Sequence, residues 1–328
     1  MAVVVVAYES GDELTRCLDS LAGEADELVV VDNGGSLELA GRADVVVVRP
    51  GRNVGFGGGC NRGFEHVRSD VVVFLNPDTV ARPGALRALA GALEEPAVGA
   101  VQARLRLLDR PERLNSSGNV LHVSGLAWPG GYGEPAESLA ERREIAYASG
   151  AAFAMRTQTF RELGGFAEEL FLYQEDLDLC WRARQRGLRV VVEPAADVLH
   201  DYVLERPGRR KEYFLERNRL LFVLTAYSAR LLVLAAPVLI AVELGIVAVA
   251  AKEGWLREKA HGWAWLLRER RWLAERRRRL QAERVVADRE LARLFEPELR
   301  LPMVAAPPGL GVLNALASLW WRLVRVVL

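Results

Sequence analysis

The 328-residue chain has few cysteines and no net charge. Cys17, Cys60 and Cys180 are odd in number, far apart and without metal-ligand spacing, which suits a reducing compartment. The 43 basic and 43 acidic residues cancel, so no global field favours nucleic acid as a partner. No signal peptide is evident, because polar residues rather than a cleavage site follow the apolar start. We therefore expect the N-terminal part to lie in the cytoplasm.

Apolar residues make up 51% of the chain and concentrate near its end. Residues 231–251 read LLVLAAPVLIAVELGIVAVAA, with Glu243 as their one charged residue. This is about the length that spans a bilayer core. Pro237 and Glu243 also fit a helix that enters a membrane without crossing it, and a buried amphipathic or hairpin segment is the third interpretation.

Tryptophan and arginine recur after this apolar run. Trp255, Trp263, Trp265 and Trp272 alternate with arginines, and residues 312–328 repeat the pattern. The headgroup layer of a membrane selects this combination of side chains. We therefore expect residues 226–328 to form a hydrophobic and basic helical region that associates with a membrane.

Short apolar runs and amphipathic stretches alternate in the first 225 residues. Residues 2–7, 27–31, 45–48, 71–75 and 98–105 are predicted strands, and helices are predicted after Asp12, at 83–93 and at 174–186. Residues 106–146 are predicted to form a variable flap, and residues 189–193 and 196–200 to form closing strands. Alternation of this kind predicts an α/β fold, a Rossmann-like, mostly parallel sheet flanked by helices.

Polar residues follow the predicted strands. Asp78 comes after DVVVFLNP, at the carboxyl end of a buried strand, where open α/β sheets place their ligands. A carboxylate there can hold a divalent cation and through it a diphosphate, or it can simply close a turn. Asp32 and Asn33 end the second strand, where a carboxylate could accept from the N3–H of a uracil or thymine, or again form a turn.

A glycine-rich stretch, residues 53–63, contains GFGGGC. It matches the dinucleotide fingerprint only in part, because it follows the third strand rather than the first and lacks the acidic ribose partner. We expect a loop that lets the backbone approach a ligand before a helix.

Two further candidates lie late in the same region. Glu175 and Asp176 open a helix, where the helix dipole keeps a carboxylate ionised, as a general base requires; plain N-terminal capping is the alternative. His200 is either a metal ligand or a core histidine. The basic run 206–211 would suit an anion-binding loop or a solvated surface.

Together these segments resemble the inverting family-2 glycosyltransferases with the GT-A fold, in particular bacterial rhamnosyltransferases. The resemblance covers about residues 2–225 and is carried by the segments VVVVAYESGDELTRCLDSL, LVVVDNGGS, RNVGFGGGCNRGF, VVFLNPD, ASGAAFAMR, LGGFAEELFLYQEDLDLCWRARQRG and YFLERNRL. It implies two domains, a GT-A domain at 1–225 and the membrane-associated region at 226–328.

The resemblance also implies residue roles. Asp176, beside Glu175, would deprotonate the acceptor hydroxyl, and Asp78 and His200 would bind Mg²⁺ or Mn²⁺. The remaining residues expected to bind the donor are Tyr8, Glu9, Asp32, Asn53, Gly55, Asn61 and Asn76. Many relatives carry an acid where this chain has Asn76, which weakens the expected metal site.

The implied reaction is transfer of a sugar from a nucleotide-sugar donor to a lipid-linked or cell-envelope polysaccharide acceptor at the cytoplasmic face of a membrane. The expected donor is dTDP-rhamnose. UDP-galactofuranose and UDP-N-acetylglucosamine are alternatives, because nothing in the sequence fixes the contacts to the sugar ring. A non-catalytic nucleotide-sugar-binding scaffold is a further alternative, and a nicotinamide-dependent oxidoreductase a more distant one.

Overall fold

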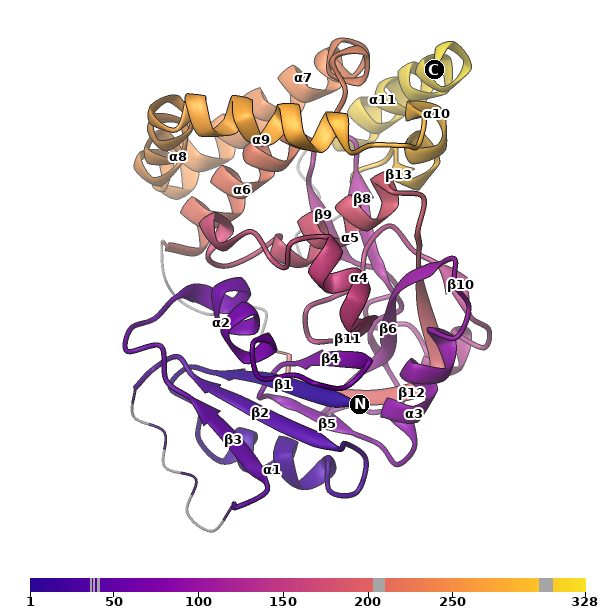
Figure 1. Ribbon diagram of the computed structural model, residues 1–328. Coiled ribbons are helices and arrows are strands. Elements are labelled where there is room, and N and C mark those ends of the chain that lie inside the picture. Colours follow the sequence, from indigo (N-terminus) through magenta and orange to yellow (C-terminus); the bar gives the residue numbers. More distant parts are fainter. Residues whose placement is uncertain (36, 38, 40–41, 203–209, 301–308) are drawn as a thin grey trace. The chain divides into compact units, whose positions relative to one another are not determined.

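The computed structural model describes residues 1–35, 37, 39, 42–202, 210–300 and 309–328 (Figure 1). The chain divides into two compact units. The sheet unit comprises residues 1–119 and 129–204, and the helical unit comprises residues 120–128 and 205–328. Our division at residue 225 differs from this one, because helix α6 (Arg210–Ala226) and the segment Val120–Trp128 group with the C-terminal helices.

The sheet unit is built on one large mixed sheet of order β10-β12-β6-β11-β4-β1-β2-β3. Strands β1, β2, β3, β4, β6 and β12 run in one direction, whereas β11 is antiparallel to both β4 and β6. The strands are β1 (Ala2–Ala7), β2 (Glu27–Asp32), β3 (Val45–Val48), β4 (Val71–Leu75), β6 (Val98–Leu107), β10 (Arg143–Glu144), β11 (Ala152–Arg156) and β12 (Arg189–His200). The expected mostly parallel α/β sheet is thereby confirmed.

Helices cover both faces of this sheet. Successive side chains of a strand point to opposite sides, so each strand packs against helices on both faces. Val3 and Val5 of β1 belong to a core that includes residues of α1 (Asp12–Ser20) and α3 (Ala85–Ala92). Val4 and Val6 point the other way, against α2 (Gly55–Phe64). Figure 1 shows α1 and α2 on opposite sides of the sheet. Burial on both faces explains the unbroken apolar runs of the strands.

The expected glycine-rich loop at GFGGGC is in fact helix α2, so this prediction was wrong. The glycines are needed because the helix packs directly on the sheet. A Cβ atom at Gly59 would lie 2.7 Å from Val6 Cγ1, and one at Gly63 would lie 2.4 Å from Val4 Cγ1. Close packing therefore outweighs the low helix propensity of glycine here.

The predicted flap at residues 106–146 was also wrong. This segment forms short strands and a turn of 3₁₀ helix, and its Asn115, Ser116 and Ser117 are buried. The short elements are β7 (Leu114–Ser116), β8 (Asn119–His122), β9 (Ala127–Pro129) and the 3₁₀ turn Ala136–Ser138. The two predicted closing strands form the single strand β12, with a register shift between Glu193 and Asp197, which pairs with β5 (Thr79–Ala81).

The helical unit contains the long apolar helix α7 (Ala229–Glu253). Its other helices are α6, α8 (Leu256–Arg268), α9 (Arg270–Ala282), α10 (Asp288–Leu291) and α11 (Leu310–Val327). Strand β13 (Phe295–Glu296) pairs with β8. An aromatic cluster joins these elements: Tyr227 packs on Phe222 and Phe295, and Phe295 packs on the fully buried Trp321 of α11.

Several tryptophans that we expected at a headgroup layer contact residues of this unit. Trp263 donates from Nε1 to Glu243 at 3.0 Å, and the Trp265 ring centre lies 4.6 Å from the Arg217 guanidinium carbon. These contacts occupy the aromatic faces internally. Of the basic run 206–211, residues 206–209 lie outside the described residues, and Arg210 begins α6.

Candidate active site

Asp78 and Asp176 are held at the same end of the sheet by a short series of contacts. The backbone N–H of Asn76 donates to the Ala151 carbonyl at 2.9 Å, which extends the pairing of β4 with β11 past the end of β4. The residue before Ala151, Gly150, donates its N–H to Asp176 Oδ2 at 2.9 Å. Asp78 follows Asn76 by two residues. The carboxyl end of β4 therefore carries one acid and faces the other, as expected for an α/β ligand site.

His200 lies beside Asp78. Their Nε2 and Oδ1 atoms are 3.3 Å apart, and the side chains are 7% and 13% exposed, so both groups are largely buried. The pairing of β12 with β5, which sets His200 opposite Thr79, brings the two residues together. On its other side, His200 Nδ1 lies 2.9 Å from Asn115 Oδ1.

The hydrogen bond to Asn115 fixes the orientation of the His200 ring. If Nδ1 donates to the Asn115 oxygen, Nε2 of the neutral ring faces the Asp78 carboxylate at 3.3 Å. Orientation of a histidine by an oxygen on its far nitrogen is typical of metal sites. Within the described residues, no group of three or more acid, histidine or cysteine side chains is placed to hold a metal.

Glu175 and Asp176 begin helix α5 (Glu175–Gln185). Burial raises the pKa of Glu175 to about 8, and the neighbouring charge of Asp176 adds to the rise. Burial also raises the pKa of Asp176 to about 6, against the opposing effect of the backbone N–H groups of Gly150 and Leu177. Near pH 7, Asp176 is therefore the ionised member of the pair and Glu175 the protonated one. A carboxylate with a pKa near 6 is suited to general-base catalysis.

Asp32 ends β2 in a buried turn. Its Oδ1 accepts from the Gly35 N–H at 2.7 Å and its Oδ2 from the Leu37 N–H at 3.2 Å. Arg49 Nε lies 3.5 Å from Oδ2. The carboxylate thus shapes the turn after β2, and its contact with a pyrimidine base stays a prediction.

Asn53 and Gly55 form the entry to α2. Asn53 Oδ1 accepts from Asn33 Nδ2 at 3.0 Å and from the Gly55 N–H at 2.9 Å. Gly55 has φ +78°, and a Cβ there would lie 2.1 Å from the Phe171 carbonyl oxygen. No other residue fits this position. These contacts bring together the end of β2, the start of α2 and the segment before α5.

Asn61 connects α2 to a second segment. Its Oδ1 accepts from the Phe166 N–H at 2.9 Å, and its Nδ2 donates to the Phe166 carbonyl at 3.0 Å. Both functional groups of this side chain are thus used to position backbone, and its role in a nucleotide pocket stays a prediction.

The other predicted donor-binding residues lie at the same edge of the sheet. Tyr8 is 51% exposed, and Glu9 is exposed with φ +51°. Both follow β1, whose last residue pairs with Asp32. Asn76 is half-buried after β4, and its carbonyl accepts from Thr79 Oγ1 at 2.7 Å.

Sequence reasoning missed Asn115. It is 2% exposed and is the residue that orients His200. It lies in residues 106–146, which we expected to form a variable flap. The available signal was three consecutive hydrogen-bonding side chains closely following the long apolar strand β6, a pattern that also fits a buried polar network.

Residues 2–164 match the family model described as "Glycosyl transferase family 2". The chain is 30% identical over 236 residues to the N-acetylglucosaminyl-diphospho-decaprenol L-rhamnosyltransferase of Mycobacterium tuberculosis, a match that covers 61% of this chain and 75% of that protein. The chain belongs to glycosyl transferase family 2.

The chain is also similar to a second curated protein and to a solved structure. It is 29% identical over 208 residues to the pre-mycofactocin glycosyltransferase of M. tuberculosis, which covers 62% of this chain but only 43% of that protein. The chain therefore spans less than half the length of this relative. The crystal structure of GalNAc-T7 with UDP, GalNAc and Mn²⁺ matches with a TM-score of 0.56 at 18% identity, over 68% of this chain and 47% of that one. This second similarity supports the GT-A fold.

Proposed function

We propose that this glycosyltransferase transfers a sugar with inversion at the anomeric carbon, and that Asp176 is the base. The observation that carries the proposal is the placement of Asp78, His200 and Asp176 at one end of the sheet. Two acids at one end of the sheet can act on opposite sides of a sugar, one on the leaving group and one on the acceptor.

The reaction needs one proton transfer. The acceptor hydroxyl oxygen forms a bond to the anomeric carbon while the bond from that carbon to the diphosphate oxygen breaks. The hydroxyl proton passes to Asp176, and the bonding electrons leave with the nucleoside diphosphate. Glu175, protonated near pH 7 because its pKa is about 8, limits the pair to a single negative charge. A single displacement inverts the anomeric carbon.

Asp78 and His200 would hold a divalent cation, Mg²⁺ or Mn²⁺. When bound, the cation would neutralise charge that develops on the diphosphate. The donor set fits, because a carboxylate oxygen and an imidazole nitrogen oriented by Asn115 are ligands that Mn²⁺ accepts. The Mn²⁺ in the similar GalNAc-T7 structure supports this assignment.

We infer that the donor is dTDP-rhamnose and that the acceptor is a lipid-linked or cell-envelope glycan. The rhamnosyltransferase similarity supports the sugar, and the decaprenol in that relative's name supports a lipid-linked acceptor. A lipid-linked acceptor is confined to the bilayer, whereas the donor is soluble. An enzyme that joins the two would therefore act at the cytoplasmic face of a membrane. Among the described residues, α7 and α11 are long and apolar enough to cross a membrane.

The test is a donor panel. The purified protein is incubated with dTDP-rhamnose, UDP-galactofuranose or UDP-N-acetylglucosamine, with Mn²⁺ or with EDTA, and melting temperature and nucleoside diphosphate release are both measured. We expect dTDP-rhamnose to raise the melting temperature most, and only with Mn²⁺, because a ligand that binds the folded state alone stabilises it. A larger effect of another donor would replace rhamnose, and binding without any release would favour a non-catalytic scaffold.

A further inference from the structure

Helix α7 presents an uncharged apolar stripe to solvent. Val233, Ile240 and Leu244 are 73%, 60% and 66% exposed, and their spacing places them on one side of the helix. The opposite side is buried through Leu231, Ala235, Val238 and Val242. A continuous exposed apolar patch of this kind marks a surface that binds a membrane or another protein.

Helix α11 carries a second stripe with the same periodicity. Its exposed apolar residues are Val312, Leu316, Leu319, Leu323 and Val326, between 55% and 86% exposed. The helix contacts α7, since Trp320 Nε1 donates to the Leu234 carbonyl at 2.8 Å. Between the two helices lies an apolar groove of about 370 Å³, lined by Pro237 of α7 and by Leu316 and Leu323 of α11. The two helices thus share one apolar face, α7/α11.

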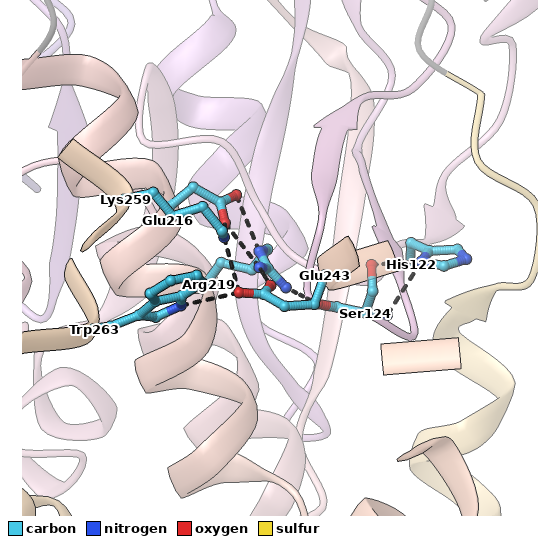
Figure 2. A network of polar contacts seen from close by, with 7 residues as sticks. All are labelled: His122, Ser124, Glu216, Arg219, Glu243, Lys259 and Trp263. Carbon is cyan, nitrogen blue, oxygen red and sulfur yellow. Dashed lines mark hydrogen bonds and ion pairs between the residues drawn. The ribbon is translucent and has the colours of Figure 1, made fainter. Parts of the chain in front are cut away.

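The one charged residue within the apolar run of α7 is turned inward. Glu243 pairs with Lys259 of α8 at 2.9 Å and with Arg219 of α6, and it accepts from Trp263 Nε1 at 3.0 Å (Figure 2). Glu216 pairs with Arg219 at 2.8 Å and with Lys259 at 2.6 Å, so two acids balance two bases. This network removes charge from the outer side of α7 and fastens the helix to α6 and α8.

The network favours one orientation in a membrane. A helix that crosses the bilayer would carry Glu243 into hydrocarbon, either separated from Arg219 and Lys259 or together with them, and both are costly. A helix that lies in the plane of the membrane inserts only its outer stripe, which leaves every ion pair of the network intact. Arginine supplies the matching charge: Arg322 and Arg325 of α11 are exposed, and residues 309–328 contain no acid. Anionic headgroups attract such residues.

We propose that the α7/α11 face is a monotopic membrane anchor, which lies in the plane of an anionic leaflet and does not cross it. The stripes enter the boundary between headgroups and acyl chains, the groove takes an apolar lipid chain, and Arg322, at the edge of the α11 stripe, contacts phosphates. This rests on the membrane association in the proposed function and specifies its surface, orientation and lipid charge.

The first test is flotation with vesicles of phosphatidylcholine and phosphatidylglycerol. The double variant Leu244→Glu/Leu319→Glu should bind at least about tenfold more weakly than the wild type, because burial of each leucine is worth about a factor of ten or more. Leu267→Glu is the matched control, since Leu267 is 69% exposed on α8, outside the proposed face. All three positions are exposed, so melting temperatures should stay equal.

Equal binding of the double variant would overturn the proposal. The proposal would also be overturned if the wild type forms dimers in lipid-free buffer and the double variant is monomeric. A second copy of the chain would then cover the face. If the wild type binds no vesicles while it still releases nucleoside diphosphate from its donor, the membrane parts fail and glycosyl transfer stands.

The second test separates a helix in the plane from a helix that spans. Ala229→Cys and Lys252→Cys introduce thiols at the two ends of α7, and the native cysteines are all buried. With protein bound to the outside of vesicles, an impermeant maleimide should label both positions equally. Since 25 helical residues extend about 37 Å, a spanning helix would protect one end until detergent opens the vesicles. Protection of one end would overturn the proposal.

Discussion

Glu175 of the sheet unit and Glu216 of the helical unit are both buried acids, but they differ in whether basic side chains pair with them. In the sheet unit, Glu175 and Asp176 have no ion-pair partner among the described residues, and burial raises their pKa values to about 8 and about 6. In the helical unit, burial acts to raise the pKa of Glu216, but Arg219 and Lys259 outweigh it and hold that pKa below its usual value.

This difference separates two uses of buried charge. Balanced ion pairs fix helices and keep one protonation state at all physiological pH values. Buried acids without a cation titrate near neutral pH, as proton-transfer groups must. We therefore propose that the sheet unit carries the chemistry and the helical unit the membrane attachment, so that substitutions in each unit should change different measured quantities.

The largest expected effect is on turnover. Asp176→Asn should lower kcat by about 10²–10⁴-fold, the range for loss of a general base, while donor affinity changes little. Asp109→Asn, an acid with a 70% exposed side chain, is the matched control and should leave kcat unchanged. Single-turnover release of nucleoside diphosphate and donor titration measure the two quantities. Equal losses in affinity and kcat would remove Asp176 as the base.

The next effect is on stability. Lys259→Met should lower the free energy of unfolding by about 3–5 kcal/mol, because it leaves the buried Glu216 and the partly buried Glu243 with one base. Lys252→Met, at the exposed end of α7, should cost little. Urea denaturation measures both. Because Glu243→Gln removes the surplus charge, the double variant should recover part of the loss; no recovery would contradict the charge-balance account.

A smaller effect is expected at the predicted cation site. Asn115→Leu should weaken Mn²⁺ binding about 10–100-fold, because the oxygen that orients His200 is lost. Asn115→Asp keeps an acceptor and should restore most of the affinity. Titration of Mn²⁺ by electron paramagnetic resonance in the presence of dTDP gives both values. Weak binding in both variants would indicate that Asn115 supports only the local fold.

The last effect concerns pH. The folded protein retains the Glu175 proton that the unfolded chain loses above its ordinary pKa of 4.5, so the free energy of unfolding should fall as pH rises from about 4.5 to about 8. Glu175→Gln should flatten this slope. Denaturation midpoints at several pH values measure it. A slope that is unchanged in Glu175→Gln would show that another group titrates.

The sheet could be predicted because its strands are buried on both faces. Residues 2–7 and 71–75 have the bounds expected from their apolar runs alone. Helix α2 could not be predicted, because its glycines serve contacts with Val4 and Val6 that only the packed structure defines. Local propensity is a weak guide wherever a helix packs this close to a sheet.

The candidate site could be predicted only where a residue followed a strand. Asp78 and Asp176 stand at the ends of recognisable elements. Asn115 reaches His200 from 85 residues away in sequence, and no local pattern encodes such a contact. The inward turn of Glu243 is equally hidden, since its partners come from two other helices.

The most direct test of one shared site is a crystal structure with Mn²⁺ and the donor product dTDP, with the metal located by its anomalous scattering. The account predicts a manganese peak between Asp78 and His200, in contact with the diphosphate, with Asp176 facing the space beyond it. A peak elsewhere, or a diphosphate bound away from these three residues, would contradict it.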